Sequence, residues 1–305
     1  MSNTWEQNLI QEVLLAQVQE QKRRRRWGIF FKLLVVGLIV FSVWQNYKPN
    51  ATGPVKHAHT ALIEVRGIIG GEEVDADDVV QSLRQAFNQD SAKAIILRID
   101  SPGGSPVHAG YIYDEIMRLR KQKPEKKIYA VIEEVGASAA YYIAAAANDI
   151  YANRASIVGS IGVIMPNFGF MDSMKKLGVE QRTITSGDHK GFLDPFSPMK
   201  PDEKAFAQTL LNTIHQQFIA AVKEGRGERL KSDPVLFSGY FWTGEQAVGL
   251  GLIDGLGSTG SVARDIIGIE DVYDYTISRN WIDRLTHRMG ATLRIQLPPL
   301  GASFQ

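Results

Sequence analysis

Short apolar segments alternate with helical segments from about residue 60 onward, and this alternation restricts the fold more than any other feature of the sequence. Apolar, strand-like runs occupy residues 61–65, 94–99, 128–132, 149–152 and 157–164. Helical patterns occupy residues 75–87, 106–120, 138–147, 201–222 and 243–250. Strands separated by helices in this order form a mostly parallel sheet with helical crossovers. We therefore predict an α/β fold.

Composition excludes several function classes before any motif is considered. The chain has 34 basic and 33 acidic residues, a net charge of +1, so no charge excess points to a nucleic-acid partner. It contains no cysteine, which rules out disulfides, cysteine catalysis and thiolate metal sites. His57 and His59 alone are too few ligands for a metal. We predict no nucleic-acid partner, no metal and no cofactor.

A basic cluster followed by an apolar run marks the amino-terminal part of the chain. Residues 22–26 are five consecutive Lys and Arg residues, and residues 27–47 are largely apolar. About 20 such residues cross a bilayer as one helix. Trp27, Trp44 and Tyr47 stand where interfacial aromatic residues are found, and Lys32 lies close enough to one end to reach the interface. We predict a transmembrane signal anchor at residues 27–47 that binds the chain to a lipid bilayer.

The charge distribution also predicts the orientation of this anchor. The positive cluster keeps the amphipathic, basic segment 1–26 in the cytoplasm, and everything after the anchor then lies outside. In a bacterium this places the chain in the cytoplasmic (inner) membrane, with its main domain on the periplasmic side. A cleaved signal peptide fits less well, because no small-x-small cleavage pattern follows Trp44. The same residues would also suit a buried core helix or a nucleic-acid patch beside one.

The rest of the chain divides into three segments. Residues 48–59 contain two prolines, a glycine, an asparagine and two histidines and are predicted to be a linker. Residues 60–270 contain the alternating strands and helices and form the predicted main domain. Residues 271–305 are assigned to a carboxy-terminal extension.

The first candidate site loop, Asp-Ser-Pro-Gly-Gly-Ser at residues 100–105, directly follows a predicted strand. Sites in parallel α/β sheets collect at the carboxyl ends of strands. Two adjacent glycines let the backbone approach a ligand closely, so the N–H groups of Gly103 and Gly104 are candidates for an oxyanion hole. A glycine turn that caps the next helix is the alternative.

The second loop places Ser138 where a strand ends and a helix begins. A nucleophile at such a turn is close to the N–H groups of the helix start, including that of Ala139, which can stabilise a developing oxyanion. Small neighbours on both sides leave room for a substrate backbone. An ordinary N-cap serine is the alternative interpretation.

The third loop, Thr-Ser-Gly-Asp-His-Lys-Gly at residues 185–191, follows a strand predicted at residues 181–185. A lysine acts as general base only in its neutral form, which burial or nearby positive charge favours. Phe192 and Leu193 follow Lys190 and are candidates for an apolar wall. An exposed surface lysine is the alternative.

Together the three loops resemble the signal peptide peptidase A family of membrane-bound serine peptidases. The resemblance covers roughly residues 60–260. It rests on the glycine loop, the Gly-Ala-Ser-Ala-Ala-Tyr-Tyr segment at residues 136–142, the Gly-Ser-Ile-Gly-Val segment at residues 159–163, and the lysine segment at residues 186–190. Lys190 also stands at the family's spacing from Ser138.

The resemblance implies a Clp protease/crotonase-like fold and a serine endopeptidase in which Ser138 and Lys190 form a catalytic dyad that works through an acyl-enzyme. It further implies that Ser160 hydrogen-bonds and orients the lysine, and that Gly103 joins the oxyanion hole. With one copy of the core domain the chain resembles the short, single-domain form of the family, and this resemblance implies assembly into a homo-oligomeric ring. The implied substrates are remnant signal peptides or other membrane-associated peptides.

Three other interpretations stay open at the level of sequence. His108 and His189 stand near the candidate loops, and a Ser-His-Asp triad is recognised by geometry rather than by order in the chain. A crotonase-type enzyme acting on acyl-thioesters would use the same glycine loop, although an exported domain argues against it. A catalytically inactive scaffold is disfavoured by the presence of both Ser138 and Lys190. Residues 237–242, rich in aromatics, are predicted to pack in the core.

Overall fold

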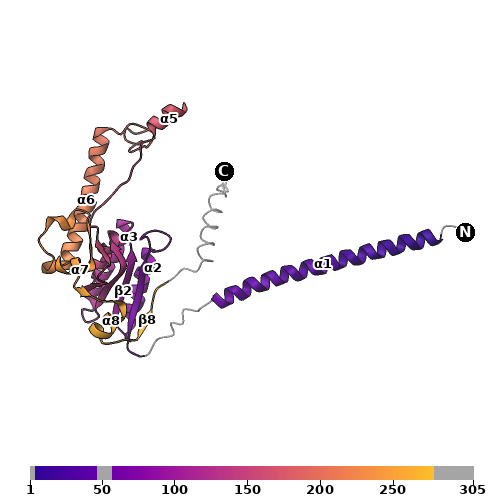
Figure 1. The fold of residues 1–305 in the computed structure, drawn as a ribbon, viewed down its shortest axis with the longest axis horizontal. Helices are drawn as coiled ribbons and strands as arrows, with labels where there is room; N and C mark the ends of the chain where they lie inside the picture. Colours follow the sequence, from indigo (N-terminus) through magenta and orange to yellow (C-terminus); the bar gives the residue numbers. More distant parts are fainter. Residues whose placement is uncertain (1–3, 47–56, 278–305) are drawn as a thin grey trace, which may run out of the picture. The chain divides into compact units, whose positions relative to one another are not determined.

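The computed structural model describes residues 4–46 and 57–277 and divides the chain into two units, residues 1–55 and residues 56–305 (Figure 1). The first unit contains the predicted anchor, and the second contains the predicted main domain. Most of the predicted linker and of the predicted carboxy-terminal extension, namely residues 48–56 and 278–305, lie outside the described residues.

The first unit is described as a single long helix, α1 (Thr4–Asn46). It contains the basic cluster and the apolar run up to residue 46, while Tyr47, the last residue of the predicted anchor, lies outside the described residues. Trp27, Phe30 and Phe31 pack edge to face or tilted against one another, and each is more than half exposed. Among the residues that the structure describes, no helix is both long enough and apolar enough to span a membrane.

An eight-stranded sheet forms the framework of the second unit. The strand order is β6-β5-β3-β2-β1-β8, and β4 pairs with β3 and with β7. Every described pairing is parallel except that of β5 with β6. The strands are β1 (His59–Arg66), β2 (Ala92–Ser101), β3 (Ile128–Ala137), β4 (Asp149–Ala152), β5 (Ile157–Gly159), β6 (Phe241–Thr243), β7 (Gly255–Leu256) and β8 (Val272–Asp274). The predicted α/β class with a mostly parallel sheet is confirmed.

Three crossover helices connect the first strands and cover one face of the sheet. They are α2 (Ala76–Asn88), α3 (Pro106–Gln122) and α4 (Ala139–Ala145). Polar caps explain where the first two begin, because Asp75 accepts from the backbone N–H of Asp77 and Ser105 accepts from that of His108. Their apolar faces pack with alternate strand residues such as Ile63, which is fully buried.

The opposite face of the sheet carries a smaller apolar cluster, in which Leu62, Ile96 and Val131 pack against Val262 and Ala263. The remaining elements of this unit follow β5 in the chain. They are α5 (Met171–Leu177), α6 (Pro201–Arg226), η1 (Gly227–Arg229), η2 (Pro234–Phe237), α7 (Gly244–Gly249), α8 (Thr259–Ser261) and η3 (Val262–Ile267).

Helix α6 and the segment before it, residues 160–200, extend away from the sheet. We call this part of the chain the excursion. Figure 1 shows α6 running away from the strands, with α5 beyond its far end. The excursion begins just after β5, and its exposed apolar side chains include Ile164, Phe168, Leu177 and Ile184. In the part of the chain that the structure describes, these side chains therefore lack the burial that apolar residues of this size usually have.

Two predicted strands differ from the structure. Residues 181–185 are not a strand: this segment has no regular structure, and Ile184 is 97% exposed, because no neighbouring strand lies beside it among the described residues. The strand predicted at residues 157–164 ends at Gly159, since Ser160 takes a positive φ of 53° and donates its N–H to the carbonyl of Tyr240. In addition β8, which lies in the predicted carboxy-terminal extension, pairs with β1.

Candidate active site

Ser138 adopts a strained backbone conformation at the junction of β3 and α4. Its φ of 54° and ψ of −125° are sparsely populated by residues other than glycine, so the surrounding structure must hold them in place. The Ser138 N–H donates to the carbonyl of Gly159, and the Ser138 carbonyl accepts from the N–H of Tyr142. Its hydroxyl forms no capping bond with α4, which contradicts the interpretation of Ser138 as an ordinary N-cap serine.

Gly103 lies directly against Ser138. A Cβ atom on Gly103 would stand 2.8 Å from the Cβ of Ser138 and 3.1 Å from the backbone nitrogen of Ala139. Only glycine fits so close to the serine, and the φ of 111° at Gly103 also favours glycine. The glycine loop and the start of α4 are therefore brought together, as expected for two parts of one site.

The N–H groups of the two loop glycines have different surroundings. That of Gly103 donates to the hydroxyl of Ser101 at 3.1 Å. Gly104 forms a bridge with Ile69 in which the Ile69 N–H donates to the Gly103 carbonyl and the Ser105 N–H donates to the Ile69 carbonyl. The Gly104 N–H takes no part in this bridge, and none of the described residues accepts a hydrogen bond from it.

A small cavity of about 130 Å³ opens beside Ser138. Gly104 and Ala139 line it together with the serine, so three of the predicted site residues share one pocket. Its other walls come from α3, α4, the segment after β5, and α6: Pro106, Tyr142, Gly162, Val163, Ile164, Ile214, Gln217 and Phe218. A mainly apolar pocket with few polar groups suits the side chain of a peptide.

An aromatic cluster supports the apolar wall of this cavity. The ring of Tyr142 stacks at a tilt on Phe218 with 4.9 Å between centroids, and meets the ring of Tyr113 edge to face at 5.2 Å. The Tyr113 hydroxyl donates to the carbonyl of Ala221 or to the carboxylate of Glu224, both on α6. Burial, with the nearby Glu224 carboxylate, raises the pKa of Tyr113, so its phenol stays protonated as a donor.

Ser160 directly follows the strand residue that holds Ser138. Gly159 accepts from the Ser138 N–H, and Ser160 comes next with its own strained φ. The signature segment at residues 159–163 is thus next to the candidate nucleophile. Ser160 is partly buried, and no described residue hydrogen-bonds to its hydroxyl, so the structure does not pair it with Lys190.

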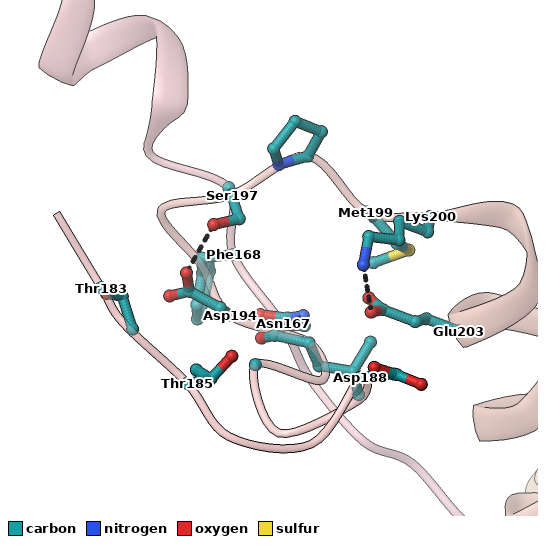
Figure 2. A pocket seen from close by; sticks show the side chains of 14 residues that line it. Asn167, Phe168, Thr183, Thr185, Asp188, Asp194, Ser197, Met199, Lys200 and Glu203 are labelled. Carbon is teal, nitrogen blue, oxygen red and sulfur yellow. Dashed lines mark hydrogen bonds and ion pairs between the residues drawn. The ribbon is translucent and has the colours of Figure 1, made fainter. Parts of the chain in front are cut away.

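Lys190 lies in the excursion, away from Ser138 within the same chain. Its side chain is exposed, and no hydrogen bond or ion pair among the described residues joins it to the serine. Its neighbours Asp188 and Gly191 line a second pocket, shown in Figure 2, which also contains the Ser197–Asp194 hydrogen bond and the Lys200–Glu203 ion pair.

Helix α6 gives a scale for the separation between the two pockets. Glu203 lines the pocket beside Lys190, whereas Gln217 lines the pocket beside Ser138. At 1.5 Å per residue these two positions are about 20 Å apart along the helix axis. The structure therefore brings Gly103, Gly104, Ser138 and Ala139 together but not Lys190.

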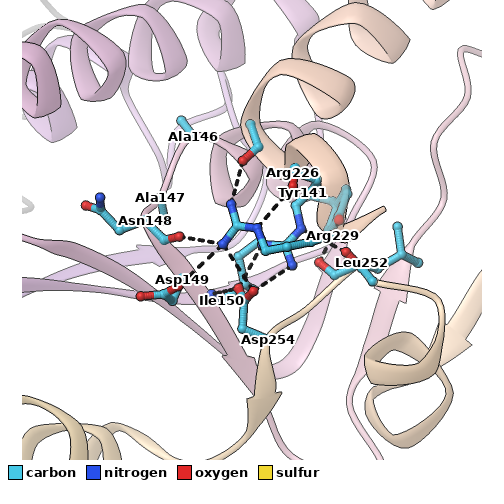
Figure 3. Close-up of polar contacts among 12 residues, drawn as sticks. Tyr141, Ala146, Ala147, Asn148, Asp149, Ile150, Arg226, Arg229, Leu252 and Asp254 are labelled. Carbon is cyan, nitrogen blue, oxygen red and sulfur yellow. Dashed lines mark hydrogen bonds and ion pairs between the residues drawn. The ribbon is translucent and has the colours of Figure 1, made fainter. Parts of the chain in front are cut away.

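Buried charges fasten the carboxyl end of α6 to the sheet next to α4 (Figure 3). The fully buried guanidinium of Arg226 forms a two-point ion pair with Asp254 at 2.8 and 3.0 Å and donates to the carbonyl of Gly251. Asp254 also accepts from Arg229 and from the N–H of Ile150. Burial opposes ionisation of Asp254, but these bonds outweigh it and lower the pKa.

The histidines considered in the triad hypothesis do not reach Ser138 in the described structure. His108 packs beside Gly70, and its Nδ1 is buried without a hydrogen-bond partner among the described residues. His189 lies in the exposed lysine loop. His59 hydrogen-bonds to the Tyr275 hydroxyl at 2.8 Å, at the edge of the sheet where β8 pairs with β1.

The aromatic run at residues 237–242 is divided between core and surface. Phe237 and Trp242 pack against the core, as predicted, while Tyr240 and Phe241 are exposed.

The sequence alone does not predict a role for several residues that form the site. Ser101 is part of the glycine loop, yet only the structure shows that its hydroxyl binds the Gly103 N–H. Tyr142 likewise belongs to the nucleophile segment. Phe218 and Gln217 give no sequence signal, because they reach the pocket from a helix far along the chain.

Comparison with known proteins agrees with the motifs. The family described as Peptidase family S49 matches residues 120–266. A putative protease of Synechocystis sp. is 35% identical over 199 residues, which cover 65% of this chain and 69% of that relative. A putative signal peptide peptidase SppA of Enterococcus faecium is 28% identical over 186 residues, 61% of this chain and 54% of that relative.

A relative from Brucella abortus has a different name. This Na(+)/H(+) antiporter NhaA is 46% identical over 186 residues, which are 61% of this chain but 25% of that protein. The chain thus spans about a quarter of the length of that relative, and the name says nothing of this chain's function. With the glycine loop, the strained serine and these matches taken together, the chain belongs to peptidase family S49, the family of the signal peptide peptidase A proteins that its motifs resemble.

Proposed function

We propose that this protein is a serine endopeptidase in which Ser138 is the nucleophile and Lys190 the general base. The observation that carries the proposal is the strained Ser138, whose hydroxyl is free of any capping role and which lines an apolar pocket beside the glycine loop. Backbone strain of this kind collects at functional sites. Membership of a peptidase family supports the same reaction class.

In the proposed reaction the Ser138 hydroxyl attacks the scissile carbonyl carbon and gives its proton to the neutral amine of Lys190. The tetrahedral intermediate collapses, and the leaving peptide amine takes that proton. The upstream peptide remains as an ester of Ser138. Water then attacks the ester and gives a proton to the lysine. The ester bond breaks, the lysine returns that proton to the Ser138 oxygen, and the carboxylic acid is released with the free serine and neutral lysine restored.

Two backbone N–H groups are suited to stabilise the tetrahedral oxyanion. Ala139 follows the nucleophile, and its N–H belongs to the first turn of α4, where no intrahelical acceptor exists. Gly104 lines the same pocket and has an N–H without an acceptor among the described residues. Gly103 contributes the close approach to Ser138, but its own N–H is already bound to Ser101. We therefore assign the oxyanion hole to Gly104 and Ala139.

We also propose that the dyad forms between neighbouring subunits of a homo-oligomeric ring. About 20 Å of α6 separates the two pockets, so a lysine from the same chain would have to move far to meet Ser138. A second copy could instead offer its lysine loop. Burial against that copy would also cover the exposed apolar side chains of the excursion, such as Phe168 and Ile184.

The membrane location is a further part of the proposal. The basic residues 22–26 and the apolar run at residues 27–47 support a signal anchor. The structure describes side chains of this run only as far as residue 41. An exported catalytic domain held at the bilayer would act on membrane-associated peptides, including remnant signal peptides. A phosphatase fused after residue 60 should be active if the domain is exported, and inactivity of that fusion in intact cells would contradict this topology.

The peptidase activity itself is tested with the purified full-length chain and a set of fluorogenic peptides with small or apolar residues before the scissile bond. We expect turnover by the wild-type chain and none by Ser138→Ala. A matched serine variant, Ser258→Ala on the far side of the sheet, should keep wild-type rates. Activity that survives Ser138→Ala would refute the assignment.

A further inference from the structure

Ser101, the last residue of β2, carries a buried hydroxyl that the proposed reaction does not use. The residue is fully buried and lies in register with Gly136 of β3, two positions before Ser138. Its Oγ accepts a hydrogen bond from the Gly103 N–H at 3.1 Å and lies 3.5 Å from the Gly103 carbonyl oxygen. A single hydroxyl therefore contacts the peptide groups on both sides of Gly103.

The orientation of the second of these peptide groups decides where the Gly104 N–H points. The Gly103 carbonyl and the Gly104 N–H belong to one planar trans peptide, so they point in opposite directions. The carbonyl also accepts from the Ile69 N–H at 2.9 Å. Fixing the carbonyl on the Ile69 and Ser101 side consequently turns the Gly104 N–H the other way, and Gly104 lines the Ser138 pocket.

Gly103 would otherwise be free to turn. Its φ of 111° lies in a region that glycine enters readily, and a glycine peptide meets little steric resistance to rotation. The bond from the Gly103 N–H to Ser101 removes this freedom, because it fixes the preceding peptide as well. Without the Ser101 hydroxyl the buried Gly103 N–H would have no acceptor, which costs free energy. Rotation of the glycine loop would relieve this cost by bringing the N–H to another acceptor.

We propose that Ser101 is a positioning residue, whose hydroxyl locks the glycine loop so that the Gly104 N–H faces the oxyanion. This inference rests on the proposed peptidase function and adds to it a residue that does not touch the substrate. It also separates two arrangements of the oxyanion hole. If Gly103 were the donor instead, Ser101 would compete with the substrate for its N–H, and removal of the hydroxyl would speed the reaction.

The test compares Ser101→Ala with wild type in the full-length protein, using kcat, KM and inhibition by a peptide aldehyde. The aldehyde forms a tetrahedral adduct with Ser138 whose oxygen occupies the oxyanion hole, whereas KM reports mainly ground-state binding. We expect kcat to fall about 10- to 100-fold, KM to stay within about two-fold, and aldehyde affinity to weaken by the same factor as kcat.

Two further variants keep the test decisive if Ser101→Ala folds poorly. Ser101→Cys keeps the volume but offers only a weak acceptor, so its kcat should fall between those of wild type and Ser101→Ala. Ser101→Thr keeps the hydroxyl and should retain more activity than Ser101→Cys and Ser101→Ala. Ser82→Ala, which removes another buried serine hydroxyl on α2, is the stability control and should leave kcat unchanged.

Failure of this inference differs from failure of the proposed function. Wild-type protein that neither cleaves peptides nor reacts at Ser138 would refute the peptidase proposal itself. An active wild type with a Ser101→Ala variant of equal or higher kcat, or with a loss confined to KM, would overturn the role of Ser101 alone. A loss of kcat with unchanged aldehyde affinity would also overturn it, since the oxyanion hole would then be intact.

Discussion

Arginine cannot replace lysine as a proton acceptor, so two substitutions at Lys190 separate a catalytic role from a merely cationic one. We expect both Lys190→Ala and Lys190→Arg to abolish peptide turnover, because a guanidinium stays charged. Ser160→Ala should weaken turnover without removing it if Ser160 orients the lysine. His108→Ala and His189→Ala should keep most of the activity. The measurement is kcat/KM on one peptide for all five variants.

The opposite pattern would replace the dyad with a histidine-based triad. A histidine variant without activity, together with an active Lys190→Ala, is the result that would do so.

Glu115 is a nearly buried carboxylate on α3 that makes stability depend on pH. Hydrogen bonds from Arg118 and then from Arg84, at 2.7–3.3 Å, lower its pKa to about 2 although burial acts the other way. Because the folded pKa is below the unfolded one, the stabilisation is complete above about pH 4.5 and is lost as the pH falls towards 2. Glu115→Gln should therefore lower the free energy of unfolding at neutral pH, by on the order of 3 kcal/mol.

The pH series distinguishes this mechanism from a simple packing defect. Denaturant unfolding of wild type and Glu115→Gln should converge as the pH is lowered from about 5 to about 3. Glu125→Gln, at an exposed position in the loop after α3, is the control and should follow wild type throughout. A deficit of Glu115→Gln that stays constant over this range would show that its ionisation is not the cause.

Single residues of the site were predictable where a local pattern carried the signal. Ser138 and the two loop glycines follow predicted strands within short, distinctive segments, and the structure brings them together. The role of Ser101 depends on which way a glycine peptide is turned, and sequence does not encode that orientation in any short pattern. Phe218 reaches the same pocket only through tertiary packing.

At the scale of elements, the buried ion pair at the carboxyl end of α6 is the feature whose loss should destabilise the fold most. Arg226 is fully buried and is paired at two points with Asp254, whose side chain is 16% exposed. Arg226→Met would leave the carboxylate of Asp254 without its main partner in the interior, which typically costs about 3 kcal/mol or more. We expect a clear fall in melting temperature, measured by calorimetry.

A paired design shows whether the missing partner is the cause. Arg226→Met combined with Asp254→Leu removes both charges and should recover part of the lost stability. Arg264→Gln breaks an exposed ion pair with Asp265 and should leave the melting temperature unchanged. If the double variant is as unstable as the sum of the two single ones, the ion pair is not what fastens α6.

The predicted elements were correct where periodicity or an uninterrupted apolar run had a partner in the sheet. β1, β2 and β3 and the crossover helices α2 and α3 lie close to their predicted ranges. Residues 181–185 have a strand-like composition but lie in the excursion without a neighbouring strand among the described residues, so their backbone cannot enter a ladder. β5 stops early for a different reason, the left-handed turn at Ser160.

At the scale of the whole molecule, the position of Lys190 relative to Ser138 could not be predicted. Spacing in the chain identifies both residues, but the distance between them depends on how far α6 carries the excursion from the sheet. The same segment carries exposed apolar side chains such as Phe168 and Ile184, which the described residues leave unburied.

Subunit mixing tests the proposal that the dyad forms between chains. Oligomers made by co-refolding Ser138→Ala with Lys190→Ala chains should regain activity, because some interfaces then join an intact serine to an intact lysine. Each variant alone should stay inactive. If both chains are present in the same oligomer, by mass spectrometry, and no activity returns, the dyad forms within each chain.

The most direct measurement of the central claim is labelling of the full-length protein with a fluorophosphonate, followed by identification of the modified peptide by mass spectrometry. These reagents phosphonylate an activated serine nucleophile and leave ordinary serines unmodified. We predict one adduct, on Ser138, which is absent from Ser138→Ala and strongly reduced in Lys190→Ala. An adduct on another serine, or a fully folded wild-type protein without any adduct, would contradict the assignment of Ser138 as the nucleophile.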